Sequence, residues 1–539
     1  MMSDMSSLLD SNNDVTDTTQ AALAWFDAHR SQFVDDLLRW VRVPSVSDES
    51  AAESGAPYGR GVADMFDEAA RTASAYGLAS RNHEGYAISV FDPAAHDLQR
   101  TESADGDPCD SGRDIAMVSH LDVVPAGPGW LSDPFSPYER DGYVVGRGAD
   151  DNKGMALLNL YLLRYYREVG VAFRHPLRVM YGGAEETGLD DMRQYVRRHG
   201  APYQAIITDC GFPVNVAQKG EITVQFTLPQ PTGLVSLTAG ASANAVPGEA
   251  NATIDCDNTS IAAQLATAIN CTDTSTCVPV SSSSTTPSPA VRANVNGTQL
   301  VITATGRSGH AAFPDGTVNA IHVLAARLIA GLTAAFDNGT TSASVSVNES
   351  LTQLFASLSR WTIDAYGTGF GVAYEDAESG RTTLNLGLIA TTGNELTLTI
   401  DIRHAVTQKP QDIVSRITQA VIAAGGRVLD AQVEPPYSVP RNDPRVTMLT
   451  DTYNRIMDTH AEPYAMGGGT HARVIPNAIN FGPGLHATDE LVAAGKVAPA
   501  PDFVHGGAHG PNEWVSIDRL RQAFAIYATA IPQLDRMLA

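Results

Sequence analysis

The stretch MVSHLDVVPAGPGW, residues 117–130, joins a strand-like run to a loop rich in proline and glycine. His120 and Asp122 stand two positions apart at the end of that run. Because residues i and i+2 of a strand point to the same face, the imidazole and the carboxylate should face the same way. For this stretch alone, a histidine held by a carboxylate in a purely structural pair is the simpler interpretation.

Other strand-like runs end in similar side chains. Asp151 follows a glycine-rich turn in GRGADDNKGM, Glu185 and Glu186 follow LRVMYGGA, and Asp209 ends AIITD. The glycine-rich loop HGGAHGPNEW near the C-terminus adds His509. These runs alternate with helix-like runs, which predicts an α/β sheet with parallel pairs. Ligands bind such sheets at the carboxyl ends of the strands, so we expect these side chains to converge.

The converging residue types are those that bind divalent cations. Adjacent glutamates are usually a solvated pair, and two aspartates before a helix are usually a cap. Those readings would require several strand ends to finish in acids or imidazole by accident. Zinc binds imidazole nitrogen and carboxylate oxygen, and two ions about 3.5–4 Å apart form a hydrolytic site. The residues supply two terminal ligands per ion, a bridging carboxylate and a free general base, so they predict a two-metal hydrolase.

Composition limits the function classes. The chain has 539 residues, more than one hydrophobic core usually supports, and a formal net charge of −24. Such an acidic surface repels phosphate backbones and anionic lipid, so we expect no nucleic-acid and no membrane partner. The N-terminal sequence lacks the basic and apolar regions of a secretory signal, and no run of about 18 apolar residues occurs. We therefore expect a cytoplasmic protein.

The pattern changes along the chain and suggests an insertion. Strand-like runs rich in Thr, Ser and Val dominate the middle of the chain, which also contains a Ser/Thr/Pro-rich excursion at residues 270–290. We predict a flexible N-terminus over residues 1–20 and a first domain over 21–220 that resumes at 406–539. An inserted α+β domain over 221–405 interrupts it. The predicted fold class is α/β, with a mixed, mostly parallel sheet flanked by helices in the first domain.

Five motifs, in this order, carry a family resemblance: SHLDVVPAG, GRGADDNKG, GGAEETG, TDCGFPV and AHGPNEW. They resemble the di-zinc peptidase family of the carnosinases, aminoacylases and succinyl-diaminopimelate desuccinylase, and within it the bacterial dipeptidases of the PepV and Sapep type. The resemblance covers roughly residues 20–539. It implies a catalytic domain interrupted by a lid, and a dipeptidase that cleaves dipeptides or short peptides through a metal-bridged water. The implied cofactors are two Zn²⁺ ions, with Mn²⁺ or Co²⁺ possible.

The resemblance also assigns roles within the first domain. Asp122 would fix the ring of His120, and Glu185 would be the general base that passes a proton from the water to the leaving amine. Asp151 would be the bridging carboxylate. The implied metal ligands are His120, Asp151, Glu186, Asp209 and His509.

The lid would contribute further residues. His310, in ATGRSGHAAFPDG, would stabilise the developing oxyanion. Asn244, Arg403, Gly468 and Thr470 match positions that bind substrate, and the guanidinium suits a free C-terminal carboxylate. For Arg403, an exposed strand arginine without a substrate role is the alternative. The family resemblance leaves open a monomer or a homodimer formed through the lid.

Some alternatives stay open at this level. An N-acyl-amino-acid or succinyl-diaminopimelate amidohydrolase would use the same metal chemistry, and a non-catalytic binding protein of the same fold would have lost a ligand or the base. A serine hydrolase is disfavoured because no GxSxG motif occurs. Asp150 could replace Asp151 as the bridge, and either His471 or His505 could contact substrate.

Overall fold

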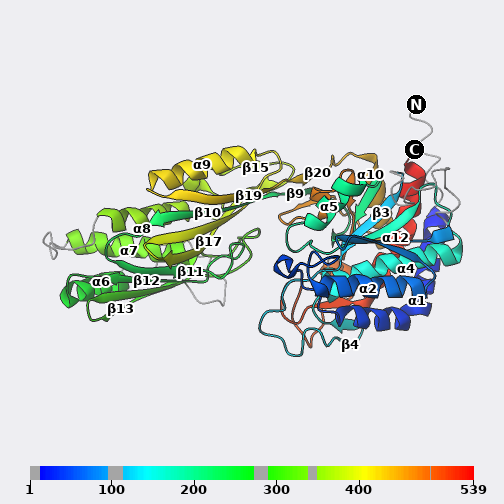
Figure 1. Ribbon diagram of the computed structural model, residues 1–539, viewed down its shortest axis with the longest axis horizontal. Coiled ribbons are helices and arrows are strands. Elements are labelled where there is room, and N and C mark those ends of the chain that lie inside the picture. Colours follow the sequence, from blue (N-terminus) through cyan, green and yellow to red (C-terminus); the bar gives the residue numbers. More distant parts are fainter. Residues whose placement is uncertain (1–11, 95–112, 272–288, 338–348, 486, 539) are drawn as a thin grey trace. The chain divides into compact units, whose positions relative to one another are not determined.

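The computed structural model describes residues 12–94, 113–271, 289–337, 349–485 and 487–538 (Figure 1). The chain divides into two compact units. The first unit contains residues 1–216, 439–464 and 470–539, and the second contains residues 217–438 and 465–469. Residues 95–112 lie outside the described residues, as does most of the Ser/Thr/Pro-rich excursion.

A nine-stranded sheet, with most of its strands in the first unit, has the order β1-β2-β6-β3-β7-β22-β9-β20, and β21 pairs with β9. Its strands are β1 (Ala79–His83), β2 (Ala87–Phe91), β3 (Ile115–His120), β6 (Leu177–Gly182), β7 (Gln204–Ile207), β9 (Asn215–Gln218), β20 (Tyr437–Ser438), β21 (Tyr464–Met466) and β22 (Ala478–Asn480). Two small sheets are formed by β4 (Tyr138–Arg140), β5 (Tyr143–Val145) and β24 (Trp514–Ser516), and by β8 (Cys210–Gly211) and β23 (Pro483–Gly484). The helices of this unit are α1 (Asn12–Val41), α2 (Arg60–Ala75), α4 (Gly154–Val169), α5 (Asp190–His199), α10 (Pro444–Met457), α11 (Asp489–Ala493) and α12 (Ile517–Met537).

The centre of this sheet is parallel, as predicted. Strand β3 pairs in parallel with both β6 and β7, and His120 at the end of β3 lies opposite Gly182 at the end of β6. Every residue of β3 and β6 is buried, which explains why both strands read as continuous apolar runs rather than alternating ones. The carboxyl ends of the three strands therefore meet at one edge of the sheet.

Two helices explain how the first unit packs. Helix α4 has buried residues on nearly all its sides, which agrees with its almost wholly apolar sequence. Helix α1 begins at Asn12, within the N-terminal segment 1–20 that was predicted to be flexible. Residues 12–20, which we expected to be flexible, are therefore helical; Val15 and Ala22 are buried, and α1 packs against α12. Residues 1–11 lie outside the described part of the chain.

The second unit is an α+β domain with an eight-stranded sheet of order β13-β14-β12-β11-β17-β18-β10-β19. The strands are β10 (Gly220–Pro229), β11 (Leu234–Ala239), β12 (Glu249–Asp255), β13 (Ala290–Asn296), β14 (Gln299–Thr305), β17 (Thr383–Thr392), β18 (Glu395–His404) and β19 (Arg427–Glu434), with a separate hairpin of β15 (Glu375–Asp376) and β16 (Gly380–Arg381). The helices are α6 (Thr259–Cys271), α7 (Ala320–Asp337), α8 (Glu349–Trp361) and α9 (Pro410–Ala423). This unit has a hydrophobic core of its own.

The second unit extends further than the predicted insertion. We expected residues 406–438 in the resumed first domain, yet they belong to the second unit. Strand β19 pairs antiparallel with β10, and the buried side chains of Ile413 and Ile417 on α9 join the second core. This segment does contain a helix followed by a strand, α9 and β19. The pairing of β19 with β10 nevertheless places both in the inserted domain.

Among the helices of the described residues, none has both the length and the apolar character that a membrane span requires.

Candidate metal centre

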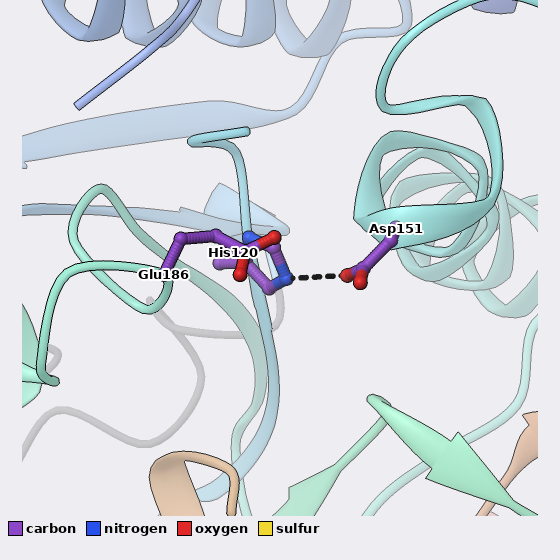
Figure 2. Close-up of side chains that lie close together, drawn as sticks. All are labelled: His120, Asp151 and Glu186. Carbon is purple, nitrogen blue, oxygen red and sulfur yellow. Dashed lines mark hydrogen bonds and ion pairs between the residues drawn. The ribbon is translucent and has the colours of Figure 1, made fainter. Parts of the chain in front are cut away.

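The predicted ligands of the first unit come together at the carboxyl edge of β3, β6 and β7. His120 ends β3, Glu186 lies in the loop after β6, and Asp209 follows β7. Asp151 lies in the tight turn Ala149–Lys153 that leads into α4. Figure 2 shows the side chains of His120, Glu186 and Asp151 directed toward one another.

Asp151 is the centre of this arrangement because its two oxygens face two different imidazoles. Its Oδ1 lies 3.0 Å from Nε2 of His120, and its Oδ2 lies 3.2 Å from Nε2 of His509. His120 Nε2 is also 3.8 Å from Oδ1 of Asp209, and His509 Nε2 is 2.9 Å from Oε2 of Glu186. The five side chains thus form two groups of three that share one carboxylate.

The local contacts of His120 leave one ring nitrogen for a ligand. Its Nδ1 is 3.0 Å from the carbonyl oxygen of Asp122, which can only accept a hydrogen bond. The proton of a neutral ring therefore belongs on Nδ1, and the lone pair on Nε2 points toward Asp151 and Asp209. A cation between these groups would satisfy all three.

The carboxylate of Asp122 does more than the predicted orientation of His120. Its Oδ1 is 3.4 Å from Nδ1 of His120, while the carbonyl oxygen of the same residue is closer. The two carboxylate oxygens accept hydrogen bonds from the backbone N–H groups of Glu185 and Glu186, at 3.2 and 3.1 Å. Asp122 therefore fixes the backbone of the two glutamates as well as the ring.

The electrostatics of the centre favour a bound cation. Burial and the neighbouring Asp209 raise the pKa of Glu185 well above its usual value. Burial and Asp151 raise the pKa of Glu186 to about 7. Hydrogen bonds from its ring to Asp151 and Glu186 raise the pKa of His509 to about 10. Several carboxylates are thus buried close together, and divalent cations would compensate their charge. Ligand atoms lie within 4.8 Å of one another in two overlapping groups: His120, Asp151 and Glu186, and His120, Glu185 and Asp209.

Asp150 occupies a different environment from Asp151. It lines a cavity of about 220 Å³, together with Met155, Trp514 and Arg519. The imidazoles of the centre contact Asp151 instead. The geometry therefore places Asp151, and not Asp150, where a shared ligand would lie.

Sequence reasoning missed a buried ion pair that supports the centre. Glu513 Oε1 accepts hydrogen bonds from the backbone N–H groups of Asp150 and Asp151, at 2.9 and 3.0 Å. Its Oε2 is 2.5 Å from Nη1 of Arg147, whose Nη2 donates to the carbonyl oxygen of His509 at 3.1 Å. The pair thus holds both the turn of Asp151 and the loop of His509. The sequence did not indicate this role of Glu513, because a single glutamate in a glycine-rich loop is usually exposed to solvent.

Three further residues of the first unit are now placed. Asn152 donates its side-chain amide to Oδ1 of Asp209 and to the carbonyl oxygen of Thr208, an orienting role that the sequence did not reveal. His471 is completely buried and bonds to Asp191, so the open alternative of a direct substrate contact does not fit its position. His505 is exposed.

Within the second unit, the loops of Asn244 and His310 are neighbours. The N–H of Ala311 donates to the carbonyl oxygen of Asn244 at 2.8 Å, and both Asn244 and His310 are exposed. Nδ1 of His310 accepts a hydrogen bond from the N–H of Ala312 at 3.0 Å. The proton of the neutral ring therefore lies on Nε2, which can donate to a ligand.

Of the remaining predicted substrate-binding residues, Arg403 and Thr470 are buried and already hydrogen-bonded within the protein. Arg403 is buried, and its guanidinium contacts both oxygens of Asp401, at 3.1 and 2.9 Å, and Oε2 of Glu221, at 2.7 Å. A substrate carboxylate would have to compete with these partners. Thr470 is buried in the first unit, and its hydroxyl donates to Asn480 and accepts from the N–H of Ala472. Gly468 lies in the segment of residues 465–469 that belongs to the second unit.

Comparison with solved structures supports the fold. The dipeptidase Dug1p from Saccharomyces cerevisiae matches with a TM-score of 0.51 at 13% identity, over 96% of this chain and 98% of that chain. The M20 family metallo-carboxypeptidase Sso-CP2 from Sulfolobus solfataricus matches with a TM-score of 0.50 at 14% identity, over 94% and 99%.

Sequence comparison extends over nearly the whole chain. "Putative dipeptidase YtjP" from Bacillus subtilis strain 168 is 28% identical over 516 residues, which are 94% of this chain and 98% of that protein. "Putative dipeptidase SH1171" from Staphylococcus haemolyticus is 25% identical over 520 residues, 94% of this chain and 97% of the relative. The model of "Peptidase family M20/M25/M40" matches residues 116–533. The chain belongs to peptidase family M20/M25/M40, and with it to the metal-dependent hydrolases of peptide bonds.

Proposed function

We propose that this protein is a dipeptidase that uses two divalent cations bound around Asp151. The observation that carries the proposal is the contact of the two oxygens of Asp151 with two different imidazoles, at 3.0 and 3.2 Å. His120 and Asp209 would complete one cation site, and His509 and Glu186 the other. Imidazole and carboxylate ligands suit Zn²⁺, and Mn²⁺ or Co²⁺ accept the same set.

Glu185 is the proposed general base. When bound, two cations of this kind would lower the pKa of a shared water and polarise the scissile carbonyl. Glu185 would accept the proton from the attacking water and return it to the leaving amine nitrogen. Asp122 holds the Glu185 backbone through a hydrogen bond of 3.2 Å, which would keep the carboxylate in a fixed place during both transfers.

The second unit would supply groups that bind the substrate and the developing negative charge. His310 carries its proton on Nε2 because Nδ1 accepts from Ala312, so it would donate to the carbonyl oxygen as that oxygen becomes negative. Asn244, whose loop adjoins that of His310, would contact the substrate beside it. Arg403, Gly468 and Thr470 stay predicted substrate-binding residues.

The preference for dipeptides is supported by the relatives, which match over nearly their full length and are named as dipeptidases. The proposed substrates are dipeptides or short peptides with a free amino end. We also propose a cytoplasmic location and a monomer, or a homodimer formed through the second unit.

A substrate panel tests this proposal. Protein loaded with Zn²⁺, Mn²⁺ or Co²⁺ is assayed on Ala-Ala, β-Ala-His, Ala-Ala-Ala, N-acetyl-alanine and N-succinyl-diaminopimelate, with a chelated sample as control. We expect hydrolysis of the dipeptides, a lower rate on the tripeptide and none on the N-acyl compounds. Hydrolysis restricted to the N-acyl compounds would instead identify an amidohydrolase.

A further inference from the structure

A buried aspartate–histidine pair lies beside the loop that carries Glu185 and Glu186. Nε2 of His471 is 3.0 Å from Oδ2 and 3.1 Å from Oδ1 of Asp191. Both side chains have no exposed surface. His471 follows the segment GGGT, and Asp191 lies in the first turn of α5, so residues 280 positions apart form this contact.

Asp191 is bonded to the glutamate loop. Its Oδ2 accepts a hydrogen bond from the backbone N–H of Ala184 at 3.0 Å. The next two N–H groups, of Glu185 and Glu186, donate to the carboxylate of Asp122. Three consecutive backbone N–H groups are therefore held by two buried carboxylates, and the loop has little freedom to shift.

Gly182 shows how closely the pair is packed against this loop. A β-carbon at this position would overlap the carboxylate of Asp191 and would lie 2.8 Å from Cε1 of His471. Gly182 also lies opposite His120 in the register of β3 and β6. The first glycine of YGGAEE is therefore required by the pair, because any larger residue would displace the carboxylate of Asp191.

We infer that Asp191 and His471 are positioning residues that fix the carboxylates of Glu185 and Glu186 for metal binding and proton transfer. The inference rests on the proposed function. Without the imidazole, the buried charge of Asp191 would lose its cationic or N–H partner and would turn toward other donors. The N–H of Ala184 would then lose its acceptor, and the position of the glutamates would become less defined. Groups that orient the residues of a metal site typically change affinity or activity by about 10–100-fold.

Variants of His471 separate positioning from general stability. His471→Leu removes the N–H partner, whereas His471→Gln keeps a donor near the position of Nε2. His175 provides a matched control, because its Nδ1 bonds to the buried Asp535 at 2.9 Å next to the opposite end of β6. The readouts are kcat and KM on a dipeptide, zinc affinity by competition with a chromophoric chelator, and the visible spectrum of the Co²⁺-loaded protein.

For His471→Leu we expect kcat to fall about tenfold or more, KM to change less than threefold, and one of the two zinc ions to bind about tenfold more weakly. His471→Gln should restore these values to within about threefold, and His175→Leu should leave them unchanged. The Co²⁺ spectrum should change for His471→Leu alone. If His471→Leu does not fold, Gly182→Ala should give the same pattern, because it displaces the carboxylate without removing either partner.

The inference is overturned if the Leu variant, or Gly182→Ala in its place, matches the wild type in kcat and zinc affinity, or if His175→Leu shows equal losses. Failure of the dipeptidase proposal is distinguishable from failure of this inference. A wild-type protein that binds zinc but hydrolyses no dipeptide would contradict the former, while the zinc competition and the Co²⁺ spectrum would still test the latter.

Discussion

Asp150 and Asp151 are adjacent in sequence but have separate environments. Asp151 contacts the imidazoles of His120 and His509, whereas Asp150 lines a cavity with Arg519. The backbone N–H groups of both residues donate to Glu513, which fixes the turn and directs the two side chains apart. At the residue scale, the direction of the side chain therefore makes Asp151, and not Asp150, the candidate metal ligand.

Replacing Asp151 should therefore have a different effect from replacing Asp150. Asp151→Ala should lose both bound metal and activity, because both imidazoles lose the carboxylate that they share. Asp150→Ala should retain metal, and elemental analysis of the two purified variants checks the difference. Loss of metal in Asp150→Ala alone would show that the bridging ligand is misassigned.

Glu185 permits a second prediction at this scale. Glu185→Ala should lower kcat by about 10²–10⁴-fold, which is the usual contribution of a general base. The metal content should stay at the wild-type level, because the proposed ligands remain. Parallel measurements of turnover and bound zinc check this. Turnover near the wild-type rate would exclude Glu185 as the base, and loss of zinc would identify it as a ligand.

At the scale of elements, the loops of the centre depend on buried polar contacts rather than on regular structure. The ion pair of Arg147 and Glu513 connects the turn before α4 to the loop before β24. Both side chains are at most 1% exposed. Removing one partner of such a pair leaves the other charged and buried, which is costly.

Arg147→Met should consequently destabilise the first unit by about 3–5 kcal/mol. The midpoint of urea unfolding, followed by tryptophan fluorescence, measures the change. Arg60→Met is the matched control in the same unit, because it removes a solvent-exposed pair with Asp64 and should shift the midpoint little. Equal shifts for the two variants would contradict the assigned role of the buried pair.

The second unit contains a histidine that should make its stability depend on pH. His322 on α7 donates from Nδ1 to the carbonyl oxygen of Ser359 on α8, at 3.2 Å. Burial lowers the pKa of His322 below its usual value near 6.5. The folded state therefore binds fewer protons than the unfolded state, so this contribution to stability is complete above about pH 6.5 and declines as pH falls through that value.

The urea midpoint of the second unit should thus fall between pH 7.5 and pH 5.5. For one proton, its free energy of unfolding should decrease by at most about 1.4 kcal/mol per pH unit. His322→Gln, which keeps a side-chain donor but cannot be protonated, should flatten this dependence. An unchanged pH profile in the variant would assign the dependence to other groups.

For the whole molecule, the main feature is the separation of the candidate metal ligands along the chain. The ligands from His120 to Asp209 precede the inserted second unit, and His509 follows it, yet all five belong to the first unit. The second unit has its own core and contains Asn244, His310 and Arg403. Metal binding should therefore stabilise one unit directly and leave the other largely unaffected.

Hydrogen exchange followed by mass spectrometry tests this expectation. Removal of metal with a chelator should increase exchange in the described segments that carry ligands, residues 118–122, 149–153, 183–187, 207–211 and 505–510. Exchange in β12 and β14 of the second unit should stay the same, and restoring zinc should reverse the change. Increased exchange across β12 and β14 would contradict confinement of the metal effect to the first unit.

The periodic and local features of this chain were predictable from the sequence alone. Strand-like apolar runs predicted β3 and β6, and the acids and imidazoles at strand ends predicted the convergence of these side chains, because parallel strands bring their carboxyl ends to one edge. The start of α1 and the extent of the insertion were predicted less well. Both depend on contacts with distant segments, α12 and β10, that local periodicity does not contain.

The sequence by itself therefore determined the α/β class, the family and the residue types of the candidate metal centre, since these depend on local patterns. Only the tertiary structure decided that Asp151 rather than Asp150 faces the imidazoles, that Glu513 supports their loops, and that His471 bonds to Asp191. The reason is physical: a buried polar group needs a partner, and the fold supplies that partner from positions far away in the chain.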